Sequence, residues 1–245
     1  MSMIRPTPLW RSVAFTLAFY VYTTIACFAL GLVLLTTRRA TMQVATWWVL
    51  GAHWLERKLL RLNFRVVGTP LLQGTAIYAF KHESSFETLK LWQLLPDPAI
   101  VYKAELARVP IFGGFLTKLG MIPVVRGAGA KALMPMIDAG RRVIAEGRPI
   151  AIFPQGTRVP VGERRPYKQG VGRLYEQLQV PVVPVALNSG YFWPKSGRKH
   201  GGTVTFDFLE PIPPGLPVEE MMRLLETRLE AACDLLDAEA RNQRA

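Results

Sequence analysis

His82 and Glu87 lie in the stretch KHESSFET (residues 81–88), directly after an apolar run, TAIYAF, that is typical of a buried strand. The chain has only 3 histidines, and a neutral imidazole can accept a hydroxyl proton near neutral pH. A carboxylate beside such a base would fix its tautomer and stabilise the imidazolium. Because five helical residues turn a side chain to roughly 140° from its starting face, the two side chains can meet only if the chain turns between them.

The same residues support a second interpretation, in which Glu87 caps a helix. Ser84 and Glu87 match the S-x-x-E pattern of a capping box, whose side chains bond the free N–H groups at a helix start. Ser84 or Ser85 can begin a helix after His82, and a His82–Glu87 contact needs the same turn. The segment alone leaves both interpretations open. A serine nucleophile is less well supported, since the sequence has no G-x-S-x-G elbow.

A second candidate segment, KAELARVPIFGG, begins at the end of the apolar run PAIVYK. Lys103 ends that run and Arg126 follows the run MIPVV, so each is placed to meet an anionic ligand. Gly113 and Gly114 permit a sharp turn or a close approach of two backbones. For a lone lysine or arginine, the alternative is a solvated surface charge.

The third segment, FPQGTR, follows the run PIAI. Phe153 and Pro154 end the strand, and Gly156 permits a positive φ or a close backbone approach. Thr157 and Arg158 offer a hydroxyl and a forked guanidinium that can bind phosphate bidentately. A turn with a charged tip would look the same in isolation. Together, however, three strand-end segments each supply a histidine or a cation, which predicts a pocket for an anion beside a base.

Seven short apolar runs supply the elements that must position these residues. The runs are FRVVG (64–68), TAIYAF (75–80), PAIVYK (98–103), MIPVV (121–125), PIAIFP (149–154), VPVVPVAL (180–187) and TVTFDF (203–208). Several are continuous, as in strands buried on both faces. Helical patterns fall at residues 85–95, 130–146 and 170–179, with a longer helix over 219–240. This alternation predicts an α/β fold, a mixed and largely parallel sheet flanked by helices, with ligands at the carboxyl ends of strands.

The start of the chain has a different pattern. No charged residue occurs in residues 12–37, whereas Arg11 precedes this run and Arg38 and Arg39 follow it. About two dozen helical residues span roughly 36 Å, enough to cross the apolar core of a bilayer. The apolar region of a signal peptide would be shorter and followed by an A-x-A-like cleavage site. We therefore predict membrane-anchoring helices over residues 1–62 and an α/β domain over residues 63–245.

The segment over residues 42–64, with Arg65 directly after it, mixes aromatic and basic side chains. They are Trp47, Trp48, Trp54, Arg57, Lys58, Arg61 and Arg65. This mixture suits the headgroup region of a membrane, and an amphipathic helix packed on the domain would look similar. Positive charge is heavier after the apolar run than before it, which predicts an inner (cell) membrane protein with its main domain on the cytoplasmic face. One full span and a hairpin within one leaflet both fit.

The charge balance favours an anionic partner. Lysine and arginine number 30 against 18 acidic residues, giving a net charge of +12, and half of the chain is hydrophobic. Nucleic acid is suggested only by this charge, and the sequence has no nucleic-acid-binding signature and no Lys/Arg block, so no nucleic-acid partner is expected. Cys27 and Cys233 lie far apart, which predicts neither a disulfide framework nor a metal site and is consistent with a reducing compartment.

Four blocks, in this order, resemble the 1-acylglycerol-3-phosphate acyltransferase family of glycerolipid acyltransferases. They are H-x4-D/E, here HESSFE (82–87); KAELARVPIFG (103–113) with the downstream Arg126; FPEGTR, here FPQGTR (153–158); and a proline-bearing apolar strand, here VPVVPV (180–185). The resemblance covers residues 64–208. Glu87 stands where aspartate is commoner. Gln155 stands where glutamate is usual and keeps a hydrogen-bonding carbonyl without the charge.

The resemblance implies a role for each matching residue. His82 would be the general base and Glu87 would orient it. Arg158, Lys103 and Arg126 would bind the substrate phosphate. The other substrate-binding residues implied are Glu105, Gly113, Phe153, Pro154, Gln155, Gly156 and Thr157.

The implied reaction transfers a fatty acyl group from acyl-CoA or acyl carrier protein to the sn-2 hydroxyl of lysophosphatidic acid, making phosphatidic acid in phospholipid biosynthesis. No metal and no cofactor are expected, and the partners are the two substrates, membrane lipid and, for one donor, acyl carrier protein. Two alternatives stay open. The acceptor can be another lysolipid, such as a lyso-ornithine lipid or lysophosphatidylglycerol, or the protein can be a non-catalytic lipid-binding relative.

Overall fold

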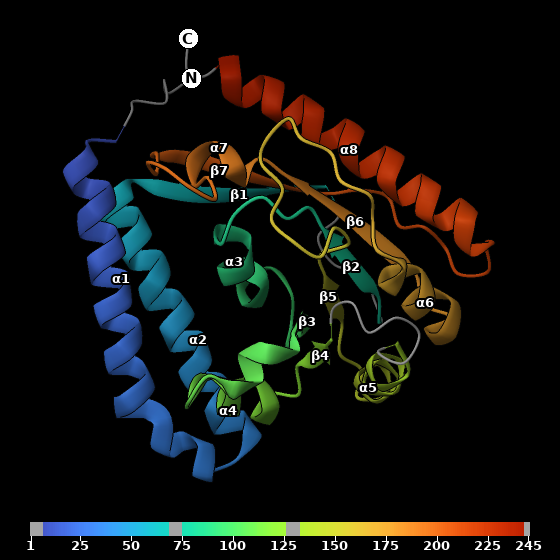
Figure 1. The fold of residues 1–245 in the computed structure, drawn as a ribbon, viewed down its shortest axis with the longest axis horizontal. Helices are drawn as coiled ribbons and strands as arrows, with labels where there is room; N and C mark the ends of the chain where they lie inside the picture. The colour runs from blue at the N-terminus through green and yellow to red at the C-terminus, as the bar shows by residue number, and fades with distance from the viewer. Residues whose placement is uncertain (1–6, 69–74, 126–132, 243–245) are drawn as a thin grey trace.

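The computed structural model describes residues 7–68, 75–125 and 133–242. Its centre is a seven-stranded sheet in the order β1-β7-β6-β2-β5-β3-β4 (Figure 1). The strands are β1 (Leu62–Gly68), β2 (Ile77–Phe80), β3 (Ala99–Lys103), β4 (Ile122–Val124), β5 (Ile150–Ile152), β6 (Val182–Leu187) and β7 (Gly202–Phe208). Neighbouring strands are parallel except β6 and β7, which are antiparallel. Each apolar run forms a strand, and the predicted mixed, largely parallel sheet is confirmed.

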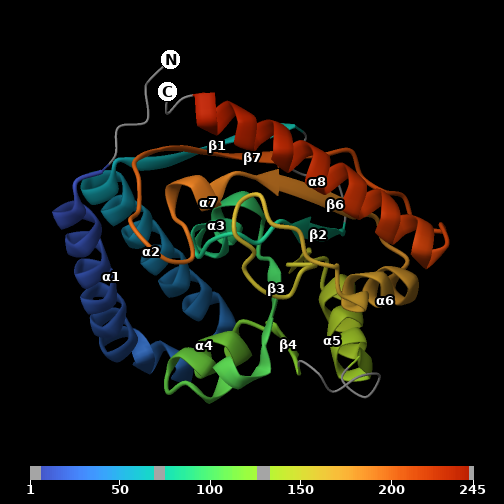
Figure 2. The same ribbon diagram turned by 45° about the horizontal axis from the view of Figure 1, so that its top comes forward.

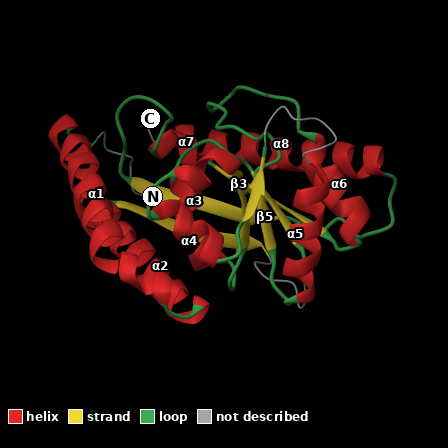
Figure 3. Ribbon diagram, turned by 60° about the horizontal axis from the view of Figure 1, so that its bottom comes forward, coloured by secondary structure: helices red, strands yellow, loops and turns green. Residues whose placement is uncertain are grey.

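Helices cover both faces of this sheet (Figure 3). They are α1 (Leu9–Leu30), α2 (Arg38–Leu55), α3 (Phe86–Leu94), α4 (Phe112–Lys118), α5 (Leu133–Ala145), α6 (Gln169–Leu178), α7 (Ser189–Phe192) and α8 (Val218–Asn242). In β2, Tyr78 and Phe80 join the core under α1–α4, whereas Ile77 and Ala79 join the core under α5, α6 and α8. Because both faces are covered, successive residues of the strand are all buried, which explains its continuous apolar sequence.

The predicted helices form with small shifts at their ends. The helix expected over residues 85–95 is α3, that over 170–179 is α6, and that over 219–240 is α8. The helix expected over 130–146 is α5, and residues 130–132 lie outside the described part of the chain. Three further elements were not predicted: the 3-10 turn η3 (Ala104–Arg108), α4 and α7.

Gly113 allows η3 and α4 to pack tightly against each other. A Cβ at this position would lie 2.0 Å from the backbone oxygen of Ala107, so a larger residue would force the two elements apart. The Gly113 N–H also donates to the carbonyl of Val109 at 2.8 Å. The close approach of two backbones expected at this glycine is therefore present, and it is a packing requirement of the fold.

α1 and α2 lie side by side at one end of the molecule (Figure 2), joined by the 3-10 turn η1 (Gly31–Leu35). The Tyr22 hydroxyl donates to the carbonyl of Trp47 at 3.2 Å, and the Trp48 indole donates to Thr23 Oγ1 at 3.2 Å. Phe15 packs edge-on against Trp193 with ring centroids 5.1 Å apart, which attaches α1 to the α/β body.

The outward face of α1 and η1 is apolar and exposed. Its large side chains include Leu9, Trp10, Leu17, Tyr20, Phe28, Leu32 and Leu35. In the described part of the chain, Leu9–Leu35 is the one helical segment long and apolar enough to cross a membrane. This helix is consistent with membrane association. The boundary at residues 62 and 63 remains a prediction, and β1 begins at Leu62.

In the tryptophan-rich segment the packing on the domain is observed, and the contact with a headgroup region remains a prediction. Trp47 and Trp54 of α2 are 64% and 58% exposed, as expected for side chains that meet a headgroup region. Val49 and Ala52 of the same helix are buried, and Trp48 packs against the core. α2 is therefore an amphipathic helix that is packed on the domain and still presents aromatic side chains outward.

Candidate active site

Three candidate segments lie at one edge of the sheet. β2, β5 and β3 are consecutive in the sheet and run parallel, so their carboxyl ends point the same way. The segments after them carry His82, the FPQGTR loop and Lys103. The first two touch directly, since the N–H of Val159 donates to the carbonyl of His82 at 2.8 Å.

The imidazole of His82 faces the carboxylate of Glu87. Nδ1 lies 2.9 Å from Glu87 Oε1, and the contact forms because the chain turns before α3 begins at Phe86. The Glu87 side chain is fully buried, whereas the His82 side chain is 16% exposed. A carboxylate only accepts hydrogen bonds, so Nδ1 donates and Nε2 is left as the basic nitrogen of the neutral ring.

Glu87 also holds the turn in which His82 lies. Its Oε1 accepts the N–H groups of Glu83 and Ser84 at 2.8 and 2.7 Å, and its Oε2 accepts the Ser189 hydroxyl at 2.7 Å. The first two bonds are those of a helix-capping glutamate. One carboxylate therefore both caps the start of α3 and contacts the imidazole, and its role in orienting a catalytic base remains a prediction.

The neighbouring Glu83 bonds the backbone of α7. Its Oε2 accepts the N–H of Gly190 at 2.9 Å. Burial, reinforced by the nearby Asp237 carboxyl, raises the pKa of Glu83 well above its usual value and favours its neutral form. Glu87, not Glu83, is the carboxylate that pairs with His82.

The FPQGTR loop packs directly on this pair. The Phe153 ring stacks on the imidazole, and the carbonyl of Pro154 accepts the Lys168 N–H at 2.7 Å. Gly156 has a φ of +66°, the left-handed conformation that favours glycine. Thr157 is half-buried in this turn.

Arg158 reaches back to the start of α3. Its Nη1 donates to Ser85 Oγ at 2.9 Å, and the side chain is partly buried. Ser85 lies three residues after His82, so this bond brings a guanidinium to the loop that carries the base. A planar guanidinium with several N–H donors is suited to hold a phosphate there.

Gln155 lies underneath His82. Its Oε1 accepts the backbone N–H of His82 at 3.1 Å, and its Nε2 donates to Glu230 Oε1 at 3.4 Å. The side chain is 1% exposed. The amide therefore supports the backbone of the base and is buried away from solvent.

Lys103 and Glu105 form a pair with each other. Their charged atoms are 3.3 Å apart and the side chains are 43% and 51% exposed. Lys103 ends β3 at the same sheet edge as His82, with its ammonium partly neutralised by Glu105. Arg126 lies outside the described residues.

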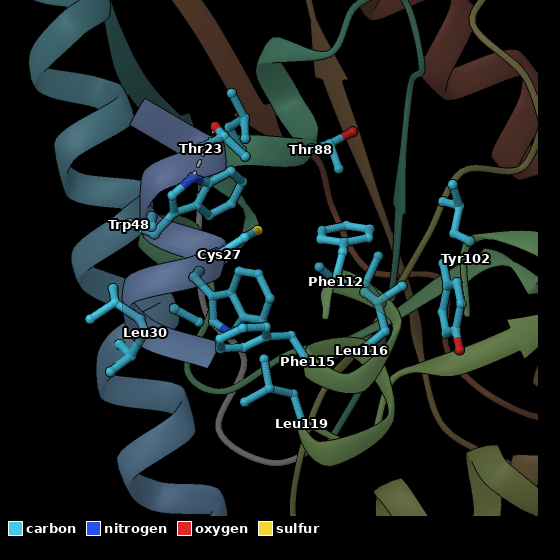
Figure 4. Close-up of a pocket in the computed structure, with 17 residues that line it drawn as sticks. Thr23, Cys27, Leu30, Trp48, Thr88, Tyr102, Phe112, Phe115, Leu116 and Leu119 are labelled. Carbon is cyan, nitrogen blue, oxygen red and sulfur yellow. Dashed lines mark hydrogen bonds between the residues drawn. The ribbon is translucent and has the colours of Figure 1, made fainter. Parts of the chain in front are cut away.

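An apolar cavity of about 160 Å³ lies beside α3. Its wall is almost wholly hydrocarbon and includes Cys27 of α1, Trp48 of α2, Leu89 of α3, and Phe112 and Phe115 of α4. Figure 4 shows these helices around the space, with Thr88 at one end. Thr88 directly follows Glu87, so the cavity reaches the helix turn that holds the base.

The model of the family described as Acyltransferase matches residues 62–188, just over half of the chain and all of β1 to β6. The chain belongs to the Acyltransferase family. His82, Glu87, Lys103 and the FPQGTR loop all fall inside the match.

Curated relatives of this acyltransferase-family chain carry related names. A 1-acyl-sn-glycerol-3-phosphate acyltransferase of Pseudomonas aeruginosa is 33% identical over 159 residues, which are 64% of this chain and 62% of that protein. The human 1-acyl-sn-glycerol-3-phosphate acyltransferase beta is 32% identical over 172 residues, which are 68% of this chain and 62% of that protein. The chain thus spans less than two thirds of the length of these relatives.

A solved structure has the same fold. The crystal structure of the 1-acyl-sn-glycerophosphate (LPA) acyltransferase PlsC from Thermotoga maritima superposes with a TM-score of 0.74, covering 93% of this chain and 97% of that one. The sequence identity is 21%. The agreement establishes the architecture of this member of the Acyltransferase family, including its seven-stranded sheet and amino-terminal helices.

Several residues around the base were not predicted from the sequence. Ser189 lies two residues after the end of β6, so its position near a strand end was a signal that could have found it. Lys81 directly follows β2 and carried the same strand-end signal, whereas Tyr167 gave none and Glu230 sits in α8, outside the matched segment. These residues come together only when α8 packs on the sheet.

Proposed function

We propose that the protein transfers a fatty acyl group from an acyl thioester to the sn-2 hydroxyl of 1-acylglycerol-3-phosphate, making phosphatidic acid. The observation that carries the proposal is the 2.9 Å contact between His82 Nδ1 and the fully buried Glu87. The names of the relatives support the choice of substrate class.

In this mechanism His82 acts as the general base. Nε2 takes the proton of the acceptor hydroxyl while its oxygen attacks the thioester carbonyl. Glu87 stabilises the imidazolium that forms. The tetrahedral intermediate then collapses, the carbon–sulfur bond breaks, and His82 returns the proton to the thiolate. The atoms and charges balance without a metal, a cofactor or a covalent acyl-enzyme.

The phosphate of the acceptor would be held by Arg158, with Lys103 and Arg126 as further cations. Arg158 is tethered beside the His82 turn through Ser85, so a phosphate bound there would keep the nearby hydroxyl within reach of the base. The net charge of +12 attracts both the anionic acceptor and an anionic acyl donor.

The apolar cavity would take an acyl chain. Its hydrocarbon wall offers no compensation for a buried polar group, and its lining includes Thr88, the residue after Glu87. The exposed apolar face of α1 would hold the domain at the membrane where the acceptor resides, with the site on the cytoplasmic side of the inner membrane, where acyl-CoA and acyl carrier protein are available. Because α1 and α2 form part of the cavity wall, a lipid substrate could enter the cavity from the bilayer.

The test is acyl transfer by the purified protein with both thioester donors and a panel of lysolipids. Lysophosphatidic acid should be preferred, and His82→Ala should remove activity while circular dichroism shows an unchanged fold. His53→Ala is a matched control, because His53 Nδ1 also pairs with a buried glutamate, Glu56, at 3.1 Å. That control should keep activity within about threefold, since its histidine is structural. Equal activity on lysophosphatidylglycerol, or an active His82→Ala, would contradict the proposal.

A further inference from the structure

A buried carboxylate, Glu230 of α8, lies behind the loop that carries His82. The Glu230 side chain is 6% exposed, and both of its oxygens accept from Lys81 Nζ at 2.7 Å. The Tyr167 hydroxyl donates to Oε1 at 2.8 Å. Burial and the adjacent carboxylate raise the pKa of Tyr167, so the phenol stays a neutral donor.

Glu230 determines which way the amide of Gln155 faces. A carboxylate only accepts hydrogen bonds, so the Gln155 NH2 group must face Glu230 and the amide oxygen must face the other neighbour. That neighbour is the backbone N–H of His82, which only donates, at 3.1 Å. One orientation therefore satisfies both partners, and it links Glu230 to the backbone of the base.

The same carboxylate also holds the residue before the base. Lys81 precedes His82 in the chain, and its side chain is 3% exposed with Glu230 as its ion-pair partner. The His82 peptide is thus tied to α8 from two sides, through Lys81 and through Gln155. On the other side of the ring, Glu87 fixes Nδ1.

We propose that Glu230 is a positioning residue for His82, acting through Gln155 and Lys81, so that α8 completes the catalytic site. The inference rests on the proposed role of His82 as the base. It extends the site beyond residues 62–188, the part of the chain that the family match covers.

A role in stability alone does not explain why the Lys81–Glu230 pair is buried beside His82. α8 already has an apolar face on the sheet, with Met221, Leu225 and Leu229 fully buried. A buried ion pair is weak evidence for stability, because the loss of hydration opposes the attraction between the charges. Positioning accounts for why the pair, the tyrosine and the amide all converge next to one histidine.

The decisive variants preserve or remove the charges together. Lys81→Met with Glu230→Met removes both charges and should fold, while leaving the Gln155 amide without its acceptor. Glu230→Gln with Gln155→Glu exchanges the amide and the carboxylate and keeps the local charge. The single variants Glu230→Gln and Gln155→Glu complete a double-mutant cycle with this swapped pair. Glu239→Gln is the matched control, since Glu239 lies on the same helix, 56% exposed, in a surface pair with Arg65.

Two readouts separate positioning from folding. The first is acyl transfer, where the double methionine variant should lose about 10- to 100-fold in kcat with little change in KM. The double variant Glu230→Gln/Gln155→Glu should recover most of the activity lost by either single variant, and Glu239→Gln should match the wild type. The second is hydrogen exchange of the His82 amide, measured by mass spectrometry, which should speed up at least about tenfold in the methionine variant.

The outcomes are distinct. The positioning role would be overturned by a folded double methionine variant with kcat within about twofold of the wild type and an unchanged rate of hydrogen exchange at the His82 amide. A double variant Glu230→Gln/Gln155→Glu that is no more active in acyl transfer than the two single variants would also count against it. If the wild type transfers no acyl group, the proposed function fails, and the exchange rate of the His82 amide still decides whether Glu230 orders this peptide.

Discussion

The ring of Phe153 stacks on the imidazole of His82, with the ring centroids 4.1 Å apart and the planes inclined by 23°. The contact restrains the face of the imidazole, while the Glu87 carboxylate restrains its edge. Phe153 follows β5 and His82 follows β2, so the stack exists because these two strands are paired. The histidine is thereby held from two directions by groups that are distant in sequence.

Phe153→Ala should lower kcat about tenfold, because the imidazole gains rotational freedom and its base nitrogen leaves the reactive position more often. Phe153→Tyr keeps an aromatic face and should retain most of the activity. Steady-state kinetics with lysophosphatidic acid would measure this, with the melting temperature as a check on folding. Equal kcat values for the alanine variant and the wild type would show that the stack has no role in orienting the base.

Glu87→Ala should affect both stability and activity, because it leaves His82, two backbone N–H groups and the Ser189 hydroxyl without their acceptor. We expect a loss of about 3 kcal/mol or more in the free energy of unfolding and about 10³-fold in kcat. Ser189→Ala removes one of these bonds and should cost about 1 kcal/mol, with a smaller fall in kcat. Urea titrations and kinetics would measure both. A Glu87→Ala protein as active as the wild type would rule out the paired-base mechanism.

Cys27→Phe should shift the preference of the enzyme toward shorter acyl chains, because the added ring occupies the apolar cavity. Each methylene that is excluded should cost about 0.8 kcal/mol, or roughly fourfold in kcat/KM. The profile would be measured with acyl donors and lysophosphatidic acids of several chain lengths. Ile25→Phe, an exposed position two residues away on α1, is the control and should leave the profile unchanged. The same profile in Cys27→Phe and the wild type would mean that the cavity does not hold an acyl chain.

Asp237 should make the stability depend on pH. Burial raises the pKa of Asp237 to about 6, opposed by Arg241 and Lys81, and its Oδ1 has no hydrogen-bond partner among the described residues. In the unfolded chain the pKa is about 4, so the native state binds more protons between these values. The stability contributed by this group is complete below about pH 4 and is lost as the pH rises through about 6.

Asp237→Asn should therefore gain stability relative to the wild type as the pH is raised. Urea unfolding of both proteins at pH 5 and pH 8 would measure the effect, and the difference in free energy between them should be larger at pH 8. Since all other titrating groups are common to the two proteins, a difference that stays constant with pH would contradict the raised pKa.

Much of the fold follows from local sequence. Seven continuous apolar runs separated by helical patterns specify a sheet covered on both faces, and strand-end positions marked His82, Lys103 and the FPQGTR loop. The short elements η3, α4 and α7 were missed, because a seven-residue helix containing Gly113 and Gly114 has no clear periodic pattern. What stabilises it is packing, including the contact of Gly113 with Ala107.

The sequence by itself determined the order of the strands along the chain, the residue types at their ends and the apolar start of the chain. The pairing of β2 with β5 and of Glu230 with Lys81 was decided only by the tertiary structure. Periodicity and capping act over one or two helical turns, so they can be read from neighbouring residues. A side chain 149 positions away becomes a neighbour only when long-range burial of the sheet and α8 brings the two segments together.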